Sequence, residues 1–298
     1  MIYELRHKTT YSYDAPVAFA RCVLRLTPRV SPWQTVLEHE IAISPGPSSI
    51  LERQGAFGEL TRTVVVDQPH RALVIEAKSR VDVHARLIDP SAPSEPWEAL
   101  RERGRESEGL SAEGPASFLY PTVRTPIVPA ITDYARLSFF PGRPIVQAAA
   151  DLMARIQADF VYDQEATDVS TPAAQAFAAR RGVCQDFVHI MISGLRGLGL
   201  PAAYISGYLR TIPPPGQPRL EGADATHAWV SLWCGPDRGW IGFDPTNAAF
   251  AENEHIMLAT GRDYADVAPI DGVILAPGGQ TLKVEVDVIP ADESDRLL

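Results

Sequence analysis

The stretch Arg180-Arg181-Gly182-Val183-Cys184-Gln185-Asp186-Phe187 places a cysteine at the predicted start of a helix. Gly182 interrupts the preceding pattern, and beyond it the apolar residues share one helical face: Phe187, Met191, Leu195 and Leu198. Unpaired backbone N–H groups and the helix dipole favour negative charge at a helix start. The pattern therefore predicts that Cys184 is a nucleophile, although the position alone also suits a small buried apolar residue.

A second stretch, Thr226-His227-Ala228-Trp229-Val230-Ser231-Leu232-Trp233, sets a histidine at the head of a β-prone run. An imidazole with an ordinary pKa of about 6.5 can take a proton from a thiol and later give it to a leaving group. We therefore interpret His227 as the candidate base. The alternative is a histidine that only caps a strand edge.

The third stretch, Gly239-Trp240-Ile241-Gly242-Phe243-Asp244-Pro245-Thr246-Asn247, predicts a short strand that ends at an aspartate. If this strand pairs antiparallel with the preceding one through a turn near residues 235–237, its open end lies beside His227. Asp244 can then orient the imidazole, although Asp-Pro is also a common way to open a turn. Taken together, Cys184, His227 and Asp244 have the residue types of a catalytic triad.

The rest of the chain predicts an α+β protein with two domains. Alternating apolar and polar residues, punctuated by proline and glycine, predict an antiparallel β-sandwich domain over residues 1–90. Residues 91–120 are rich in proline and charge, which predicts a linker with a solvated helix or loop. Residues 121–298 form the predicted catalytic domain, in which four helices precede a return to strands. The predicted helices are 127–137, 145–160, 171–180 and 184–198, and the predicted strands are 203–209, 228–233, 239–243 and 281–288. The proline-rich segment 213–218 is predicted to be an exposed loop.

Composition narrows the class of protein. The chain has 298 residues, of which 45% are hydrophobic and 21% charged, which is typical of a folded globular protein. A formal charge of −10 argues against a nucleic-acid partner. No apolar run is long enough for a membrane span or an export signal, so we expect no membrane partner and a cytoplasmic location.

Other candidate groups predict no additional chemistry. Three cysteines provide neither a disulfide framework nor a metal-binding pair, which suits a reducing compartment. Cys22 and Cys234 are interpreted as structural thiols. The downstream residues His255, Asp263, Asp266 and Asp271 lack a compact ligand spacing, so no metal and no other cofactor is expected.

The three stretches, in this order and at this spacing, resemble the signature blocks of the transglutaminase-like superfamily. The resemblance is close over residues 145–247, and the N-terminal β-region more diffusely resembles the extra domain of bacterial members. It implies a papain-like core in which Cys184 attacks a carboxamide or peptide carbonyl and forms a thioester. Water or an amine then resolves the thioester.

Five further residues are candidates for the substrate cleft: Gln185, Asp186, Tyr204, Tyr208 and Trp229. Asp186 also suits a capping role, and Trp229 also suits a core. The backbone N–H of Cys184 is one expected oxyanion donor, and the sequence does not identify the second.

We predict hydrolysis of an amide bond in a peptide or protein substrate. Three alternatives stay open: protein crosslinking through glutamine and lysine, a non-catalytic polypeptide-binding module, and acyl transfer from a thioester cofactor as in arylamine acetyltransferases.

Overall fold

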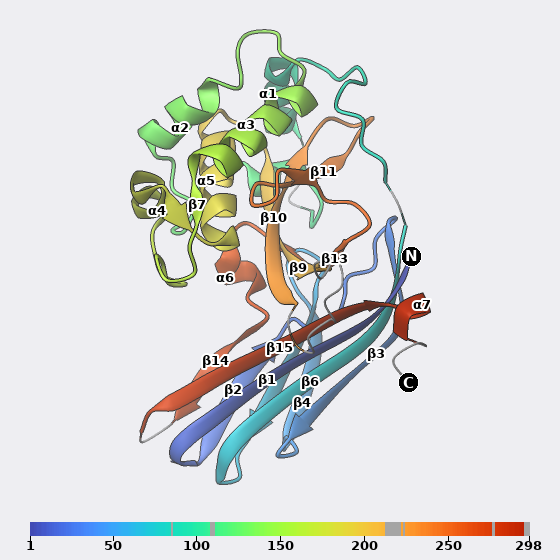
Figure 1. Cartoon of the computed structure of the whole chain (residues 1–298), viewed down its shortest axis with the longest axis vertical. Coiled ribbons are helices and arrows are strands. Elements are labelled where there is room, and N and C mark those ends of the chain that lie inside the picture. Colours follow the sequence, from blue (N-terminus) through green and yellow to red (C-terminus); the bar gives the residue numbers. More distant parts are fainter. Residues whose placement is uncertain (85, 108–110, 212–221, 223, 276–277, 295–298) are drawn as a thin grey trace, which may run out of the picture.

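The computed structural model describes residues 1–84, 86–107, 111–211, 222, 224–275 and 278–294. A β-sandwich and a mixed helical and β core lie one above the other along the long axis, and the N-terminus lies close to the last described helix, α7, at one end of the sandwich (Figure 1). The predicted α+β class, with a β-rich N-terminal region, is confirmed. The predicted loop at 213–218 lies outside the described residues.

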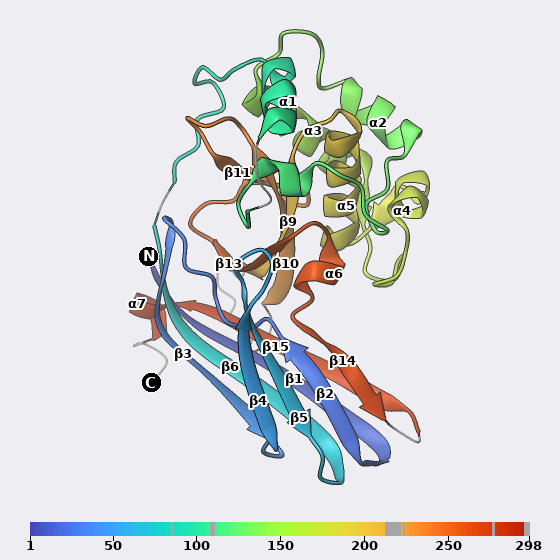
Figure 2. The same cartoon turned by 180° about the vertical axis from the view of Figure 1, so that it is seen from behind.

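Two four-stranded antiparallel sheets form the sandwich. Their orders are β15-β1-β6-β3 and β14-β2-β5-β4, and Figure 2 shows the second sheet from its own side. The first sheet comprises β1 (Ile2–Val17), β3 (Gln34–Ser44), β6 (His70–Val83) and β15 (Gln280–Pro290). The second comprises β2 (Phe19–Leu24), β4 (Ser49–Gln54), β5 (Leu60–Val66) and β14 (Ile270–Leu275).

The long strand β1 belongs to both halves of the molecule. Its odd-numbered residues point to one face, as the alternation of a strand requires. Near the start of β1, Tyr3 and Leu5 pack in a cluster with Tyr208 of the mixed core, whereas Tyr13 near its far end packs in the sandwich core. A single strand face therefore passes from the domain interface into the sandwich, and His7 lies between the two clusters.

The catalytic domain predicted for residues 121–298 does not include the last two strands, β14 and β15. Strand β15 pairs antiparallel with β1 from Tyr3↔Pro290 to Tyr13↔Gln280, and β14 pairs with β2. Val286 and Val288 are buried in the interface cluster, where each contributes roughly 1.5 to 3 kcal/mol of hydrophobic stabilisation. The last two strands therefore complete the N-terminal sandwich.

The segment predicted as a linker packs on the core. Helix α1 (Trp97–Glu106) buries Trp97 and Leu100 in the largest hydrophobic cluster, and the Trp97 Nε1–H donates to the carbonyl oxygen of Phe140 at 3.1 Å. Its arginines and glutamates form exposed ion pairs, as the charge pattern predicts. Only one face of this segment is solvated.

A central helix, α5 (Cys184–Gly197), organises the mixed core. Almost every residue of α5 is buried, because α2, α3 and α4 pack on one side and strands β9 and β10 on the other. No helix in the described part of the chain has the length and apolar character to cross a bilayer. The other helices are η1 (Pro115–Phe118), α2 (Pro129–Arg136), α3 (Ile145–Asp159), α4 (Ala173–Ala179), α6 (Tyr264–Val267) and α7 (Ala291–Ser294).

The core sheet has the order β12-β11-β10-β9-β13 and is antiparallel. The predicted hairpin is confirmed, because β10 and β11 pair from Trp233↔Trp240 to Val230↔Phe243. This register carries the free ends of both strands toward the start of α5. The strands are β9 (Ala202–Leu209), β10 (Ala225–Trp233), β11 (Trp240–Asp244), β12 (Ala249–Phe250) and β13 (His255–Gly261).

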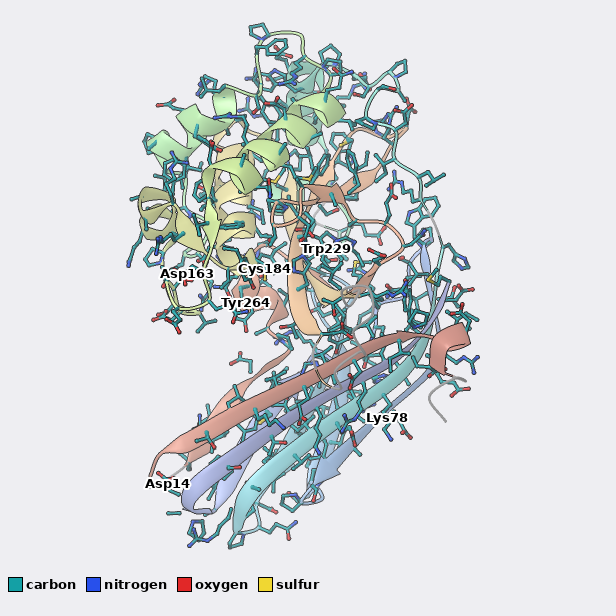
Figure 3. All side chains as sticks on the ribbon, viewed as in Figure 1. Asp14, Lys78, Asp163, Cys184, Trp229 and Tyr264 are labelled. Atoms are coloured by element: carbon teal, nitrogen blue, oxygen red, sulfur yellow. The ribbon has the colours of Figure 1, made fainter. Side chains whose placement is uncertain are left out.

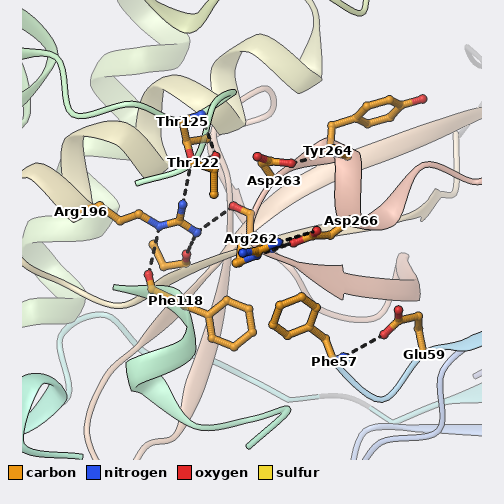
Figure 4. Close-up of polar contacts among 12 residues, drawn as sticks. Phe57, Glu59, Phe118, Thr122, Thr125, Arg196, Arg262, Asp263, Tyr264 and Asp266 are labelled. Atoms are coloured by element: carbon orange, nitrogen blue, oxygen red, sulfur yellow. Dashed lines mark hydrogen bonds and ion pairs between the residues drawn. The ribbon is translucent and has the colours of Figure 1, made fainter. Parts of the chain in front are cut away.

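The buried Arg196 holds the far end of α5 in place (Figure 4). Its guanidinium donates to the carbonyl oxygens of Phe118, Ala202 and Arg262 and to Oγ1 of Thr125, at 2.7 to 3.0 Å. Burial lowers the pKa of Arg196 to about 10, so the group is still charged at neutral pH. One side chain thus connects α5 to the segment before α2, to β9 and to the loop before α6.

We expect Arg196→Met to lower the free energy of unfolding by roughly 3 kcal/mol, since four acceptors in or near the core lose a charged donor. Arg262→Met is the matched control. The Arg262 guanidinium makes a half-exposed ion pair with Asp266 at 2.8 Å, and its loss is expected to cost less than about 1 kcal/mol. Urea unfolding of both variants checks this, and equal losses would contradict the assigned role of Arg196.

Candidate active site

Cys184 is the first residue of α5, and the turn before it is built around a carboxylate. Asp186 Oδ2 accepts the backbone N–H of Val183 at 2.8 Å and the hydroxyl of Thr167 at 2.7 Å. A Cβ at Gly182 would lie 2.5 Å from that same oxygen, so only glycine fits there. The short parallel pair β7 (Val161–Tyr162) and β8 (Arg181–Gly182) fixes the approach of the chain to the helix. The thiol of Cys184 is half-buried.

The structure brings His227 and Asp244 together. The Nε2–H of His227 donates to Oδ2 of Asp244 at 2.8 Å, and both side chains are buried. The thiol of Cys184 and the ring of His227 line the same cleft. Because Nε2 is directed at Asp244, Nδ1 is the ring nitrogen left to face the sulfur. The three residues therefore lie in the order thiol, imidazole, carboxylate.

Asp244 is fully buried and is surrounded by hydrogen-bond donors. Its Oδ2 also accepts from Nε2 of His255 at 3.2 Å and from Nδ2 of Asn247 at 2.7 Å. Its Oδ1 accepts the backbone N–H groups of Thr246 and Asn247. Burial alone raises the pKa of a carboxyl, but the donors from His227 and His255 outweigh it and hold the pKa of Asp244 well below its ordinary value.

The same contacts act on His227 in the opposite direction. Burial favours its neutral form, but the hydrogen bond to Asp244 and the nearby Cys184 raise its pKa to about 10. His227 is therefore an imidazolium at neutral pH. This cation lines the same cleft as Cys184, the first residue of α5.

His255 is a functional candidate that sequence reasoning missed. It lies at the start of β13, and its ring lies 5.1 Å from that of Trp229. Strand β13 pairs with β9, and in the sheet order β10 and β9 lie between β13 and β11, which ends at Asp244. No local pattern in the sequence therefore signals the contact between His255 and Asp244. In the sequence, His255 is visible only as a lone histidine.

Ligand atoms of His227, Asp244 and His255 lie within 4.8 Å of one another, which is close enough for a metal ion. In this geometry both imidazole groups instead direct an N–H at one carboxylate oxygen. A cation there would have to displace both protons. We therefore interpret the cluster as a hydrogen-bond network.

Cys184 and His227 open into a cleft of about 290 Å³ between the two domains. The core side contributes Gln185, Tyr204 and Tyr264, and Figure 3 shows Cys184 and Tyr264 above the sandwich. The sandwich side contributes residues of β1, β14 and β15: His7, Thr9, Tyr11, Ile270, Leu282 and Val284. The cleft beside the thiol is therefore formed by both domains.

Only some of the predicted cleft residues line this cleft. Gln185 and Tyr204 do, whereas Asp186 is buried in the capping turn. Tyr208 lies in the domain interface, where its hydroxyl bonds Nδ1 of His7 at 2.9 Å. Trp229 lines a different cavity of about 490 Å³ that also includes His255. That cavity is the larger one, but the smaller cleft holds the cysteine and histidine that can react.

The other two cysteines differ from Cys184 in their surroundings. Cys22 and Cys234 are buried, and burial raises the pKa of Cys22 to about 11 and that of Cys234 to about 12. Both thiols are therefore protonated at neutral pH and out of contact with solvent. This matches their interpretation as structural residues.

Family comparisons agree with this geometry. The model described as the transglutaminase-like superfamily matches residues 140–245, and that of the bacterial transglutaminase-like N-terminal region matches residues 3–82. The chain belongs to the transglutaminase-like superfamily. The first range contains Cys184, His227 and Asp244, and the second lies within the sandwich.

Relatives of this transglutaminase-like protein extend over the whole chain. An uncharacterized protein of Mycobacterium tuberculosis is 38% identical over 295 residues, which cover 97% of this chain and 92% of the relative. One from Mycobacterium leprae is 30% identical and covers 95% and 96%. A protein-glutamine gamma-glutamyltransferase of Pseudomonas aeruginosa is 31% identical over 43% of this chain and 23% of its own length.

A solved structure shares the two-domain architecture. The crystal structure of a candidate cysteine protease from Cytophaga hutchinsonii superposes with a TM-score of 0.74 at 21% identity, covering 98% of this chain and 92% of the other. The predicted papain-like, transglutaminase-like core with a β-sandwich domain is confirmed.

We expect Asp244→Asn to lower the pKa of His227 from about 10 toward its ordinary value, because the carboxylate that stabilises the imidazolium is removed. The His227 ring then loses its proton at a lower pH. An NMR titration of ring-labelled histidine measures the shift. Asp159→Asn is the control, since Asp159 is an exposed residue that bonds Tyr134. An unchanged His227 titration in Asp244→Asn would contradict the assigned contact.

Proposed function

We propose that this protein is a cysteine-nucleophile acyl-transfer enzyme that hydrolyses amide bonds in peptide or protein substrates. One observation carries the proposal. A half-buried thiol at a helix start shares a cleft with an imidazolium whose far nitrogen donates to a buried carboxylate at 2.8 Å. In this arrangement Cys184 is the nucleophile, His227 is the acid and base, and Asp244 orients the ring.

The first half of the reaction forms the thioester. With His227 as the imidazolium, Sγ of Cys184 attacks the substrate carbonyl carbon as a thiolate. The electron pair of the C=O bond moves to oxygen, where the orphan N–H groups at the start of α5 stabilise it. The tetrahedral intermediate then expels the amine, which takes the proton from His227.

The second half releases the acid. The neutral imidazole of His227 accepts a proton from water, and the hydroxyl attacks the thioester carbonyl carbon. The C–S bond breaks, and the electron pair returns to the Cys184 sulfur as thiolate. The imidazolium and the thiolate are restored, so the cycle consumes one water for each amide bond.

The lining of the cleft supports water as the acyl acceptor. The described lining residues are neutral polar and apolar side chains around two histidines, and burial lowers the pKa of one of them, His7, to about 4. A lysine acceptor meets the acyl-enzyme, in which the Cys184 sulfur is esterified. It enters as a cation, and no carboxylate is among these lining residues to balance its charge. Crosslinking is the second candidate, favoured by the similarity to a protein-glutamine gamma-glutamyltransferase.

We expect Cys184→Ala and His227→Ala to lower the rate of casein hydrolysis by at least about 10⁴-fold, because the nucleophile and the base act as one unit. Circular dichroism is expected to stay unchanged. Cys22→Ala is the control, since its thiol lies in the sandwich core. Full turnover in either site variant would refute the proposed function.

The product formed from casein shows whether water or an amine is the acyl acceptor. In water enriched in oxygen-18, hydrolysis places one heavy oxygen in each new carboxyl group of casein. In the presence of monodansylcadaverine, amine transfer instead attaches the fluorophore to glutamine side chains. We expect labelled carboxyl groups and little fluorescence in casein, and the reverse result would favour crosslinking.

The non-catalytic alternative makes a different prediction for thiol reactivity. If the cleft only binds a polypeptide, Cys184 has no need of an activated thiol. Alkylation by iodoacetamide at neutral pH would then modify Cys184 no faster than the buried Cys22. We expect selective modification of Cys184.

A further inference from the structure

Strand β15 is an edge strand that borders the active-site cleft. It pairs with β1 along one side. On its other side the described residues before β10 contact it through the bridge Asp224↔Val286 and through the N–H of Gly222, which donates to Oδ1 of Asp287 at 2.6 Å. At the bridge, the backbone N–H of Asp224 donates to the carbonyl oxygen of Val286 at 3.0 Å. The N–H of Val288 donates to a carboxylate oxygen of Asp224 at 2.6 Å. The polar groups of Val286 and Val288 therefore point away from β1.

The same alternation fixes the groups next to the cleft. In an antiparallel strand, both backbone polar groups of every second residue point to the same side. Since the backbone N–H and C=O groups of Val286 point away from β1, the backbone groups of Val284 and Leu282 point away from β1 as well. Among the residues that the structure describes, no strand pairs with this part of β15. An open edge of backbone donors and acceptors thus runs beside the site.

The cleft is the wedge that forms where β10 diverges from β15. Asp224 touches β15, and β10 then rises from it to pair with β9 (Figure 1). Thr226 and His227 of β10 line one side of the cleft, and Val284 and Leu282 of β15 line the other. The open edge therefore begins where the wedge begins and continues past the reacting groups.

The side chains of this edge that face the cleft are apolar. Leu282 is 57% exposed and Val284 is 45% exposed, whereas the charged residues that commonly protect a free edge alternate with them on the opposite face, where Lys283 pairs with Glu285. On the same face of β1, Thr9 and Tyr11 pair with these two residues and also line the cleft. An extended chain on this edge would meet both backbone partners and an apolar surface.

We propose that the polypeptide substrate binds as an added strand on the open edge of β15 and in this way presents a carbonyl group to Cys184. This inference rests on the proposed function for the identity of the reacting group, but binding itself does not require the thiol. Backbone hydrogen bonds carry most of the recognition, so the enzyme accepts extended segments of varied sequence. Folded regions, whose backbone groups are already paired, are excluded.

Proline substitution at Val284 tests the role of the outward N–H. Proline removes this donor without removing a hydrogen bond to β1, and an edge strand tolerates it at such a position. Val284→Ala is the matched control, because it shortens the side chain and keeps the N–H. Both substitutions are made in Cys184→Ala, and binding of fluorescein-labelled β-casein is measured by anisotropy.

We expect the dissociation constant for β-casein to be about five- to tenfold higher for Val284→Pro than for Val284→Ala, the loss of one backbone hydrogen bond. The pair Leu282→Pro and Leu282→Ala repeats the comparison at the next outward position, and thermal unfolding identifies a variant that fails to fold. Equal affinities within both folded pairs, or no binding of β-casein, would overturn the inference.

Failure of this inference is distinguishable from failure of the proposed function. The reactivity of Cys184 toward iodoacetamide in the otherwise unchanged chain reports on the nucleophile alone. Binding in the Cys184→Ala background reports on the strand edge alone. If casein binds at β15 while Cys184 is unreactive toward iodoacetamide, the inference about the strand edge stands and the proposed function is rejected.

Discussion

The buried carboxylate of Asp244 is the constraint on which the site depends. An ionised carboxylate removed from water is stable only when donors replace its hydration. Two imidazole groups, a side-chain amide and two backbone N–H groups do so here. These donors come from β10, from the turn after β11 and from β13, so the charge connects three strands of the sheet. The orientation of His227 toward Cys184 follows from this network.

A second constraint connects the site to the sandwich. Strand β1 packs at one end against the core and at the other inside the sandwich, and the cleft lies at the transition. Because β15 pairs along the length of β1, the end of the chain forms one side of a cleft whose nucleophile lies on α5. The sandwich is thus structurally part of the candidate active site. This arrangement gives a physical reason for the two domains to occur together.

Features set by local pattern could be predicted from the sequence. Helix α5, its start at Cys184 and the hairpin that aligns His227 with Asp244 follow from helical spacing, a break at Gly182 and a short turn. Features set by long-range pairing could not. The C-terminal strands join the sandwich across most of the chain, and His255 reaches Asp244 through a neighbouring strand pair. Strand β4 is exposed on both faces, so no alternating pattern of apolar residues marks it in the sequence.

A cytoplasmic location, and the lack of nucleic-acid and membrane partners, depend on charge and on the apolar pattern alone, and they stay predictions. A peptide or protein substrate also stays a proposal, argued from the cleft and from the open edge of β15.

A rapid acid quench during turnover of casein, followed by mass spectrometry of the digested enzyme, tests the central claim most directly. The account predicts an acyl adduct on the peptide that contains Cys184, and hydroxylamine is expected to remove it because a thioester is cleaved by that nucleophile. Turnover with no adduct at Cys184, or with a hydroxylamine-sensitive adduct on Cys22 or Cys234, would contradict the account.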